Sequence, residues 1–322
     1  MSGNGGRPVG GPTVDMLVDL ATRFYVAGET QVEIARSVGL DPSTVSRYLK
    51  RARDDGIVRV DIQRPRSLHG DLALELAEGF HLKRAVVVAG EPGAGANEAV
   101  AWAAADYVKS HLLNGMRLGL SWGRMLSAAV HMLPPGTVSE LDISMLHGGV
   151  SSSGAGIQGN ELARHLASLH PRSRAHYLHA PVLVDSPDIK DAMMRDGSIR
   201  SALESAAASE LALVGIGTLD DSAPLIRFGH ISPRDRKRLI AAGAVGDMCT
   251  RFFDPAGEPV HVLDQRLIAI EWDELKRIPL VVGMAAGLEK RDAILGALRS
   301  GCLDVLITDE STARAVLRAA KR

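Results

Sequence analysis

Residues 30–53 read TQVEIARSVGLDPSTVSRYLKRAR and decide the fold of the N-terminal part of the chain. The threonine that opens the stretch and Glu33 three residues later predict a capping box at the start of a first helix. Gly39 then permits a tight turn with a positive φ angle. Asp41 and Pro42 are residue types that begin helices, so a second helix is expected there. Two short helices joined by a glycine turn predict a helix-turn-helix.

The second predicted helix has an apolar and a polar face. Val45, Tyr48, Leu49 and Ala52 recur at helical spacing and form the stripe that packs inward. The opposite face carries hydroxyl and basic side chains, namely Ser43, Thr44, Ser46, Arg47, Lys50 and Arg51. In a helix-turn-helix the second helix lies in the DNA major groove, with its N-terminal residues at the base edges. The alternative is an ordinary pair of helices whose basic face is only solvated.

The polar side chains of this module have different expected partners in double-stranded operator DNA. Arg47 is the candidate for a bidentate contact to guanine, which reads the sequence. Lys50, Arg51 and Arg53 are expected to meet phosphates, which position a protein without specifying a sequence. Gln31, at the start of the first helix, is a further expected phosphate contact.

The charge distribution supports a small DNA-facing module. The 322-residue chain has 37 basic and 38 acidic side chains, and hence a net charge of −1. Residues 36–66 hold eight basic and four acidic side chains, so this window carries +4 and the remainder carries −5. Charge separated in this way is typical of a nucleic-acid-binding module attached to a near-neutral or acidic body.

Composition excludes several classes of protein. Apolar residues make up 46% and charged residues 23% of the chain, which excludes a disordered, collagen-like or coiled-coil protein. The longest uncharged run, residues 143–160, is too rich in Gly and Ser to span a bilayer, and no secretory signal opens the sequence. Cys249 and Cys302 are too few for a disulfide framework or a four-thiolate metal site. We therefore expect a cytoplasmic protein with no membrane partner.

Length and pattern divide the chain into two domains, since about 100–200 residues per domain is usual. Residues 1–12 contain five glycines and two prolines, cannot bury an apolar face, and are expected to form a flexible arm. A helical pattern begins at Thr13 and stops at Gly28. We expect a helix-turn-helix DNA-binding domain at residues 13–64 and a second, larger domain at residues 65–322.

The second domain alternates short apolar runs with helical patterns. Six runs predict buried strands, at residues 85–89, 116–120, 141–146, 211–216, 280–285 and 303–308. Helical patterns follow most of them, for example at residues 98–113 and 289–299. Apolar strands that alternate with helices predict a Rossmann-like α/β domain, in which a parallel sheet is covered on both faces.

Short segments along the whole chain carry a family resemblance. They are the helix-turn-helix quoted above, GLSWGRML at 119–126, HGGVSS at 147–152, HAPVL at 179–183, LVGIGT at 213–218, GDMCTRFFDPAG at 246–257, AAGLEK at 285–290 and LITDESTA at 306–313. With these segments in this order, from about Val14 onward, the sequence resembles the SorC family of sugar-responsive bacterial transcriptional regulators.

The resemblance implies a winged-helix-like N-terminal domain and an effector domain similar to sugar-phosphate isomerases. It implies a regulator of carbohydrate metabolism that is controlled by a bound sugar, generally a phosphorylated one. It also implies a homo-oligomer, either a dimer or a tetramer.

Two loops rich in glycine and serine follow adjacent predicted strands and form the expected effector site. Ser121, Trp122 and Gly123 end one strand, and Gly148, Gly149, Ser151 and Ser152 end the next. Ligands of open α/β sheets bind outside the carboxyl ends of strands, where glycine lets backbone N–H groups approach an anion. The alternative is that both loops are ordinary strand-to-helix turns, which also favour Gly and Ser.

Four charged residues complete the candidate site. Lys290 begins a helix after a glycine, and the family resemblance favours a contact to the effector over a solvated lysine. Asp247 and Asp309 are candidates for sugar hydroxyls, although Asp309 is equally suited to capping the last helix. Arg251 is a candidate for the phosphate, with a surface acid as its alternative partner.

Nothing in the sequence predicts a cofactor or a metal. The glycines at residues 93–95 lack the spacing of a dinucleotide-binding loop. The histidines His165, His170, His176 and His179 have no carboxylate or thiolate set at metal spacing. His147 stands where related regulators commonly carry Asn or another polar residue, so the identity of the effector does not carry over from them.

An enzyme is the competing interpretation. A sugar-phosphate isomerase or deaminase with a helical appendage would need a positioned acid and base, for which Asp247 and Lys290 are the candidates. No set of nucleophile, base and orienting residue is visible beside them. We therefore expect a transcriptional regulator and not an enzyme.

Overall fold

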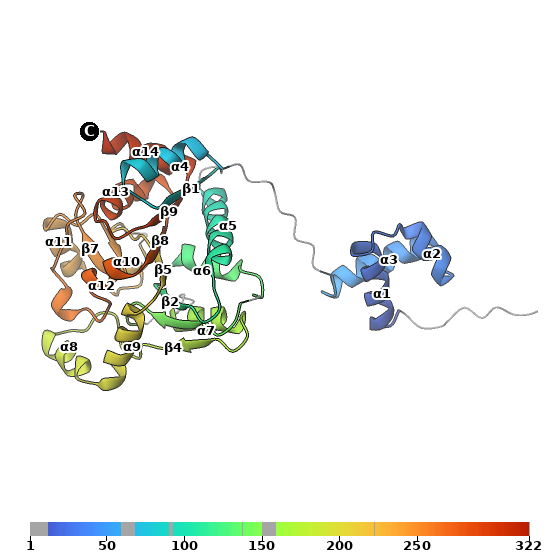
Figure 1. Cartoon of the computed structure of the whole chain (residues 1–322), viewed down its shortest axis with the longest axis horizontal. Coiled ribbons are helices and arrows are strands. Elements are labelled where there is room, and N and C mark those ends of the chain that lie inside the picture. The colour runs from blue at the N-terminus through green and yellow to red at the C-terminus, as the bar shows by residue number, and fades with distance from the viewer. Residues whose placement is uncertain are drawn as a thin grey trace, which may run out of the picture. The chain divides into compact units, whose positions relative to one another are not determined.

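The computed structural model of the chain describes residues 12–58, 68–89, 93–136, 138–149, 159–221 and 223–321 (Figure 1). The chain divides into two compact units, residues 1–65 and 66–322, which we call the N-terminal and the C-terminal unit. The predicted arm, except Pro12, and the predicted boundary between residues 64 and 65 lie outside the described residues.

Three helices form the described part of the N-terminal unit: α1 (Val14–Tyr25), α2 (Gln31–Val38) and α3 (Pro42–Asp54). The predicted capping box is confirmed, because the Glu33 N–H donates to the Thr30 hydroxyl and the Thr30 N–H donates to the Glu33 carboxylate. Gly39 has a φ of 69°, the left-handed conformation that the predicted turn requires. The helix-turn-helix therefore forms as its sequence predicts.

All three helices share the core of this unit. Leu17 and Leu20 of α1, Ile34 of α2, and Val45 and Leu49 of α3 are buried in one cluster. The inward stripe predicted for α3 is thus confirmed. A two-helix motif alone leaves such side chains exposed, so α1 serves as the third helix that covers them.

The start of α3 differs from the prediction in one detail. Asp41 stands at the N-cap position, but its side chain bonds to no backbone N–H of the helix. The Asp41 carboxylate accepts the Thr44 hydroxyl instead, at 3.3 Å. The N-cap side chain Asp41 is therefore bonded to Thr44, one of the hydroxyl residues on the polar face of α3.

Seven parallel strands form the sheet of the C-terminal unit, in the order β1-β9-β8-β5-β2-β3-β4. Their bounds are β1 (Arg84–Val88), β2 (Arg117–Leu120), β3 (Asp142–Met145), β4 (Arg174–His176), β5 (Leu211–Gly215), β8 (Leu280–Met284) and β9 (Val305–Asp309). Every pairing between neighbours is parallel. The six predicted strands and the parallel sheet are confirmed.

Helices cover both faces of this sheet (Figure 1). Their bounds are α4 (Gly70–Gly79), α5 (Ala94–His111), α6 (Arg124–His131), α7 (Gly159–Ser168), α8 (Pro187–Met194), α9 (Gly197–Ala207), α10 (Pro224–Arg227), α11 (Pro233–Ala241), α12 (Trp272–Arg277), α13 (Arg291–Arg299) and α14 (Glu310–Ala320). One core joins α5, α6 and α7 to Val86 and Val88 of β1, and the other joins α4, α13 and α14 to Ala85 and Val87. Successive strand residues point to opposite faces, which explains why β1 is an unbroken apolar run.

An antiparallel hairpin of β6 (Gly246–Met248) and β7 (Arg251–Phe253) stands apart from the main sheet and was not predicted. Phe252 of the hairpin packs in a small cluster with Leu225 of α10 and Leu239 of α11, and Trp122 lies against this cluster. The hairpin and the two helices therefore flank the loop that follows β2.

The strand order creates a crevice at the carboxyl edge between β2 and β5. From β2 the chain continues to β3 and β4, and it then returns to β5 on the other side of β2. The loops after β2 and β5 thus leave in opposite directions. Such a topological switch point is where open α/β sheets bind ligands.

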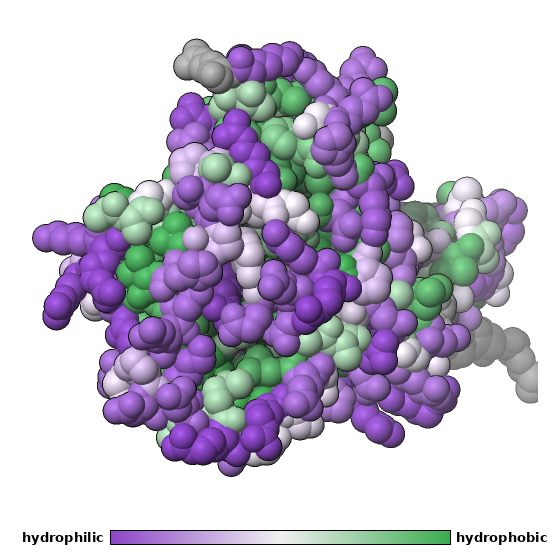
Figure 2. Space-filling view, turned by 60° about the vertical axis from the view of Figure 1, so that its left-hand side comes forward, coloured by the Kyte–Doolittle hydropathy of each residue, from purple (hydrophilic) through white to green (hydrophobic). Residues whose placement is uncertain are grey.

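Most large apolar side chains lie inside the two units. The face shown in Figure 2 is mainly hydrophilic, and hydrophobic residues appear between the polar ones in separate patches. The exceptions include Val14 and Val18 of α1, whose exposed fractions are 66% and 45%. These two lie one helical turn apart, so they form an apolar strip on the outside of the N-terminal unit.

Candidate functional site

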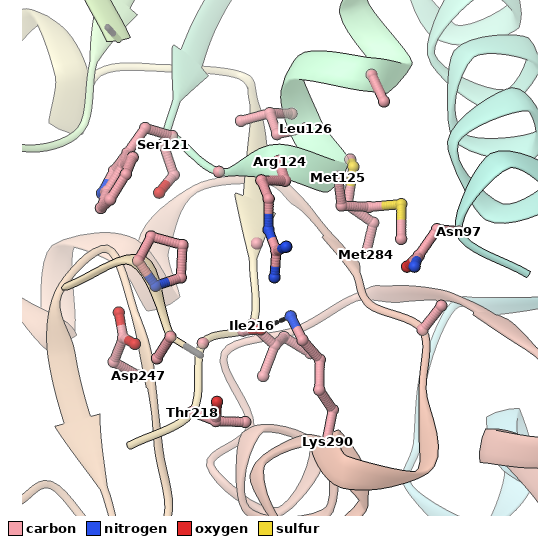
Figure 3. Close-up of a pocket in the computed structure, with 18 of the residues that line it drawn as sticks. Asn97, Ser121, Arg124, Met125, Leu126, Ile216, Thr218, Asp247, Met284 and Lys290 are labelled. Atoms are coloured by element: carbon pink, nitrogen blue, oxygen red, sulfur yellow. Dashed lines mark hydrogen bonds between the residues drawn. The ribbon is translucent and has the colours of Figure 1, made fainter. Parts of the chain in front are cut away.

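A cavity of about 440 Å³ occupies the crevice between β2 and β5 (Figure 3). Its lining residues come from segments far apart in the sequence: 97–98 of α5, 121–126, 128 and 132 of the β2 loop and α6, 215–218, 220 and 223–225 after β5, 247 of β6, and 284, 286, 289 and 290 after β8. Small-molecule sites usually measure about 300–1,000 Å³, so this cavity has room for one compact ligand.

Five residues of the predicted effector site line this cavity: Ser121, Trp122, Gly123, Asp247 and Lys290. Six other polar lining residues were not among the predicted ones, namely Asn97, Glu98, Arg124, Thr218, Asp220 and Glu289. Arg124 and Thr218 lie within the quoted segments GLSWGRML and LVGIGT. Their proximity depends on the pairing of β2 with β5, which no local pattern contains.

Arg124 opens α6 at the wall of the cavity. Gly123 before it has a φ of 146°, a backbone conformation that L side chains rarely adopt, and it forms the N-cap of α6. The N-terminal end of a helix carries partial positive charge and free N–H groups. No carboxylate of the described residues forms an ion pair with Arg124, so its guanidinium adds a positive charge at this point that no direct contact to a carboxylate neutralises.

Lys290 reaches toward Arg124 from the opposite wall (Figure 3). Its ammonium donates to the Ile216 carbonyl at the end of β5, at 2.6 Å. Burial lowers the pKa of Lys290 most, and the Arg124 charge lowers it further, while Asp247, Glu289 and Asp220 raise it. Two cations that face each other in this way favour an anion between them.

Asp247 supplies a carboxyl group on the other side of the cavity. It is 8% exposed, and its carboxylate accepts the Thr250 N–H at 3.1 Å. Burial raises the pKa of Asp247 to about 6, against the opposing effects of the Thr250 N–H and the Lys290 charge. A Cβ at Gly217 would lie 2.0 Å from an Asp247 carboxylate oxygen, so glycine at 217 makes room for this side chain.

Ser121 is held by a buried histidine. The Ser121 hydroxyl oxygen lies 3.1 Å from His147 Nε2, and His147 Nδ1 lies 2.9 Å from the Gly148 carbonyl. A carbonyl only accepts, so Nδ1 carries the proton and Nε2 accepts from Ser121. Burial lowers the pKa of His147 to about 4, which keeps the ring neutral. The Ser121 oxygen therefore offers its lone pairs, and a ligand hydroxyl can donate to them.

Gly148 and Gly149 have packing roles in place of the predicted anion contact. Their N–H groups donate to the carbonyls of Ile268 and Ala180, at 2.8 and 2.7 Å, and neither glycine lines the cavity. A Cβ at Gly148 would lie 2.6 Å from the Ala180 carbonyl oxygen, so glycine is needed there for close backbone contact. The predicted residues Ser151 and Ser152 lie outside the described residues.

Arg251 is a structural residue and does not reach the cavity. It is 4% exposed, donates to the backbone carbonyls of Ala269 and Ile270, and pairs with Asp264 and Glu271. These contacts hold the guanidinium outside the cavity, so the predicted phosphate contact is corrected. The alternative partner expected for Arg251, an acidic side chain at the surface, is the one observed.

Asp309 caps α14, and its predicted contact to a sugar hydroxyl is likewise corrected. The carboxylate accepts the Thr312 N–H at 3.0 Å and the Gly287 N–H at 3.1 Å, and Asp309 does not line the cavity. Burial raises the pKa of Asp309, but the hydroxyls of Ser311 and Thr312 and the two N–H groups together hold it below its ordinary value. Because Gly287 precedes the turn that bears Lys290, Asp309 helps to fix the position of that lysine.

Gly148→Ala should destabilise the C-terminal unit strongly, while Gly149→Ala should change little. The added methyl group collides with backbone at position 148, whereas at position 149 its nearest neighbour would be the Ala180 carbonyl oxygen at an ordinary 3.8 Å. Overpacking of this kind costs roughly 1–3 kcal/mol or more. Thermal unfolding of both variants measures the difference. Equal melting temperatures would contradict the packing role of Gly148.

Asp247→Asn should stabilise the protein at neutral pH. The pKa of about 6 in the folded state, against an ordinary 3.8, means that the folded chain binds this proton more tightly than the unfolded chain. The contribution of this carboxyl to the free energy of unfolding is therefore lost as pH rises from about 4 through about 6. We expect a gain of roughly 1–3 kcal/mol at neutral pH that vanishes below about pH 4. Denaturant unfolding at several pH values, with the exposed Asp191→Asn as control, tests this; a pH-independent gain would contradict it.

The polar face predicted for α3 lies on the surface of the N-terminal unit. Ser43, Ser46, Arg47 and Lys50 are exposed. Arg47 donates to the Thr44 hydroxyl one turn earlier, at 3.3 Å, and the predicted phosphate contact Arg51 pairs with Asp55 at 3.2 Å. Gln31 is half-buried at the first position of α2. The predicted base-reading and phosphate-contacting residues thus lie on one helix face and one helix start.

Comparison with known proteins agrees with this arrangement. Residues 67–318 match a family described as a sugar-binding domain, and residues 27–59 match the winged helix-turn-helix DNA-binding family. The transcriptional regulator LsrR of Enterobacter sp. (strain 638) is 32% identical over 311 residues, which cover 94% of this chain and 93% of that protein. The deoxyribonucleoside regulator of Bacillus subtilis (strain 168) is 30% identical over 303 residues, which cover 93% and 96%. The crystal structure of the full-length sorbitol operon regulator SorC of Klebsiella pneumoniae matches with a TM-score of 0.76 at 28% identity, over 96% of this chain and 100% of that one.

A helix-turn-helix joined to a sugar-binding α/β unit defines a transcriptional regulator and not a sugar-phosphate isomerase. The chain belongs to the SorC family of sugar-binding transcriptional regulators. Within the described ranges, no helix is long and apolar enough to cross a membrane. In the same ranges no cluster of three or more His, Cys, Asp or Glu side chains is arranged to hold a metal ion.

Proposed function

We propose that this regulator is a cytoplasmic, homo-oligomeric protein of carbohydrate metabolism whose cavity binds a phosphorylated sugar. Binding of the sugar changes the affinity of α3 for operator DNA. The observation that carries the proposal is the meeting of Arg124, Lys290 and the N-terminal end of α6 at one point of the cavity. This point suits a phosphate, because both cations can donate charge-assisted hydrogen bonds to it, and such bonds are roughly twice as strong as neutral ones.

The remaining polar lining residues suit the hydroxyls of a sugar. The Ser121 oxygen accepts, because its proton is directed to His147. Thr218 contributes a hydroxyl, and Asp247 contributes a carboxyl group from the hairpin. The cavity therefore presents cations for a phosphate and mixed donors and acceptors for a polyol in the same space.

Calorimetry with free and phosphorylated sugars, in the absence and presence of operator DNA, tests both parts of the proposal. The phosphorylated sugar should bind far more tightly than its free counterpart. Linkage requires that operator DNA change the affinity for the sugar by the same factor as the sugar changes the affinity for DNA, typically by about 1–3 kcal/mol. A preference for the free polyol would refute the phosphate site. Equal sugar affinity with and without operator would refute the switch.

The protein should be at least a dimer in solution. Helix-turn-helix proteins gain specificity by reading two half-sites about one turn of DNA apart. The exposed strip of Val14 and Val18 on α1, with Val26 beyond the end of the helix at 81% exposure, is apolar surface that a subunit contact would cover. Sedimentation at micromolar concentration, with and without DNA, measures the state. A monomer under both conditions would contradict the prediction.

A further inference from the structure

The first described residues of the C-terminal unit, Leu68 and His69, are tied to the carboxyl end of β1. Leu68 forms an antiparallel bridge with Val88, and the His69 N–H donates to the Val87 carbonyl at 2.9 Å. Along the chain, these two residues follow the segment that joins the N-terminal unit, which contains α3, to the C-terminal unit. We call Leu68 and His69 the entry strap, because the C-terminal unit holds the chain that leads to α3 at these residues.

The side chain of His69 connects the entry strap to the start of α14. His69 Nε2 lies 2.9 Å from one carboxylate oxygen of Glu310, the first residue of α14, and the two side chains are 29% and 33% exposed. The other carboxylate oxygen of Glu310 accepts from Arg314 Nε one turn later, at 2.9 Å. Glu310 therefore divides its carboxylate between the entry strap and its own helix.

The first turn of α14 also holds the turn that bears Lys290. Asp309, which caps α14, accepts the Gly287 N–H at 3.1 Å, and the Thr312 hydroxyl oxygen lies 3.0 Å from the same nitrogen. Asp309 and Thr312 are almost completely buried, with exposed fractions of 1% and 0%. Leaving a buried polar group without its partner is costly. A displacement of the Gly287 turn is therefore expected to move the start of α14 with it.

This turn is the backbone that an anion in the cavity displaces first. The Lys290 ammonium donates to the Ile216 carbonyl, and Arg124 extends toward it from the opposite wall (Figure 3). A phosphate between the two cations attracts both, and the attraction is strong in a buried site. Lys290 follows Gly287 by only three residues, so a pull on its ammonium acts on the turn that Asp309 holds.

We propose that the entry strap couples the cavity to α3. An anion that displaces the Lys290 turn shifts the first turn of α14, and the contact between Glu310 and His69 passes this shift to the entry strap. The inference rests on the proposed function and adds the residues that transmit the signal of the effector. His69 and Glu310 are positioning residues, since neither lines the cavity and neither belongs to the N-terminal unit.

The coupling factor of the full chain tests the proposal. It is the ratio of the affinities for a sugar phosphate with and without DNA from the promoter region of the protein's own gene, measured by calorimetry. The probe is the tightest binder among ribose 5-phosphate, glucose 6-phosphate and fructose 6-phosphate. Coupling between two sites usually amounts to about 5–150-fold, in either direction.

Two single variants and their combination isolate the contact. His69→Ala and Glu310→Ala should each bring the coupling factor about 2- to 5-fold closer to one, which is the usual worth of a partly exposed ion pair. The sugar phosphate and the DNA should still bind when each is added alone. The double variant should lose no more than either single variant, because the two side chains act as one pair.

Two matched controls remove other ion pairs of α14. Arg314→Ala removes the second partner of Glu310 but leaves its contact to His69. Lys321→Ala removes the ion pair at 2.9 Å between the C-cap of α14 and Glu75 of α4. Both controls should keep the coupling factor of the unmodified chain, even where thermal unfolding shows the same loss of stability as in His69→Ala.

The outcomes separate this inference from the function on which it rests. No binding of any of the three sugar phosphates, or a coupling factor of one in the unmodified chain, overturns the proposed function and the inference together. A coupling factor that stays unchanged in His69→Ala and Glu310→Ala overturns the inference alone. Equal losses in the two controls also overturn it, because the effect then reflects a weakened α14. Additive losses in the double variant overturn the assignment of the two residues as one coupling pair.

Discussion

Replacing Arg124 and Lys290 together by glutamine should abolish the response of this regulator to a sugar phosphate. Each side chain is expected to make a charge-assisted hydrogen bond to the phosphate, worth roughly 1.5–3 kcal/mol. Loss of both should weaken binding of the sugar phosphate by about a hundred-fold or more, while binding of the free sugar changes little. Calorimetry gives the affinities, and a gel-shift titration with the effector gives the response on operator DNA.

The folded state should tolerate this double substitution. Burial and the neighbouring Arg124 both lower the pKa of Lys290, which means that folding disfavours its charge. Removing that charge should leave the melting temperature unchanged or higher, and the affinity for operator without effector should persist. The matched control is Lys109→Gln with Arg200→Gln, two exposed cations of α5 and α9 that do not line the cavity. An equal loss for free and phosphorylated sugar would contradict the assigned role of the two cations.

Arg47→Ala should relax the operator specificity of the protein, and Lys50→Ala should weaken its binding to every DNA sequence. Both side chains are exposed on the polar face of α3, and Arg47 is nearer to the N-terminal end, which enters the major groove. A bidentate contact to guanine discriminates by roughly 1–3 kcal/mol. Loss of one phosphate contact reduces the salt slope of binding by about one unit.

Gel-shift titrations on operator and on random DNA, at several salt concentrations, distinguish the two roles. Arg47→Ala should lose affinity for operator and little for random DNA, while Lys50→Ala should lose both in parallel. Arg51→Ala is an informative third variant, because Arg51 pairs with Asp55 and has less of its charge free. Equal losses on both DNAs for Arg47→Ala would remove its assignment as the base-reading residue.

The sequence predicts the strands well because each is a buried apolar run in a parallel sheet. The exception is β4, whose three residues Arg174–His176 lie at the sheet edge and include two exposed polar side chains. The β6–β7 hairpin also escapes prediction, since a run of three residues has no distinctive period. Caps and turns of the N-terminal unit are predicted well, because the capping box and Gly39 act locally.

The site was predictable only in part. Glycine and serine after β2 mark the cavity correctly, but the glycines after β3 serve backbone packing, and a local pattern cannot separate the two uses. Arg251 and Asp309 show the same ambiguity, since a charged side chain that binds a phosphate or a hydroxyl also satisfies carbonyls and helix ends. Arg124 and Thr218 meet in one cavity because β2 and β5 are neighbours in the sheet, and only the strand order reveals that neighbourhood.

The place of β1 at the edge of the sheet also bears on how the protein is made. β1 pairs with β9 along its whole length, so β1 finds this partner only after the more than 200 intervening residues and β9 itself have left the ribosome. Contacts between such distant segments slow folding and leave strand edges exposed meanwhile. The cavity needs the same late residues, because Lys290 lies between β8 and β9. A nascent chain is therefore unable to sense its effector until the segment from β8 to β9 has been made, whereas the DNA-reading helices are made well before it.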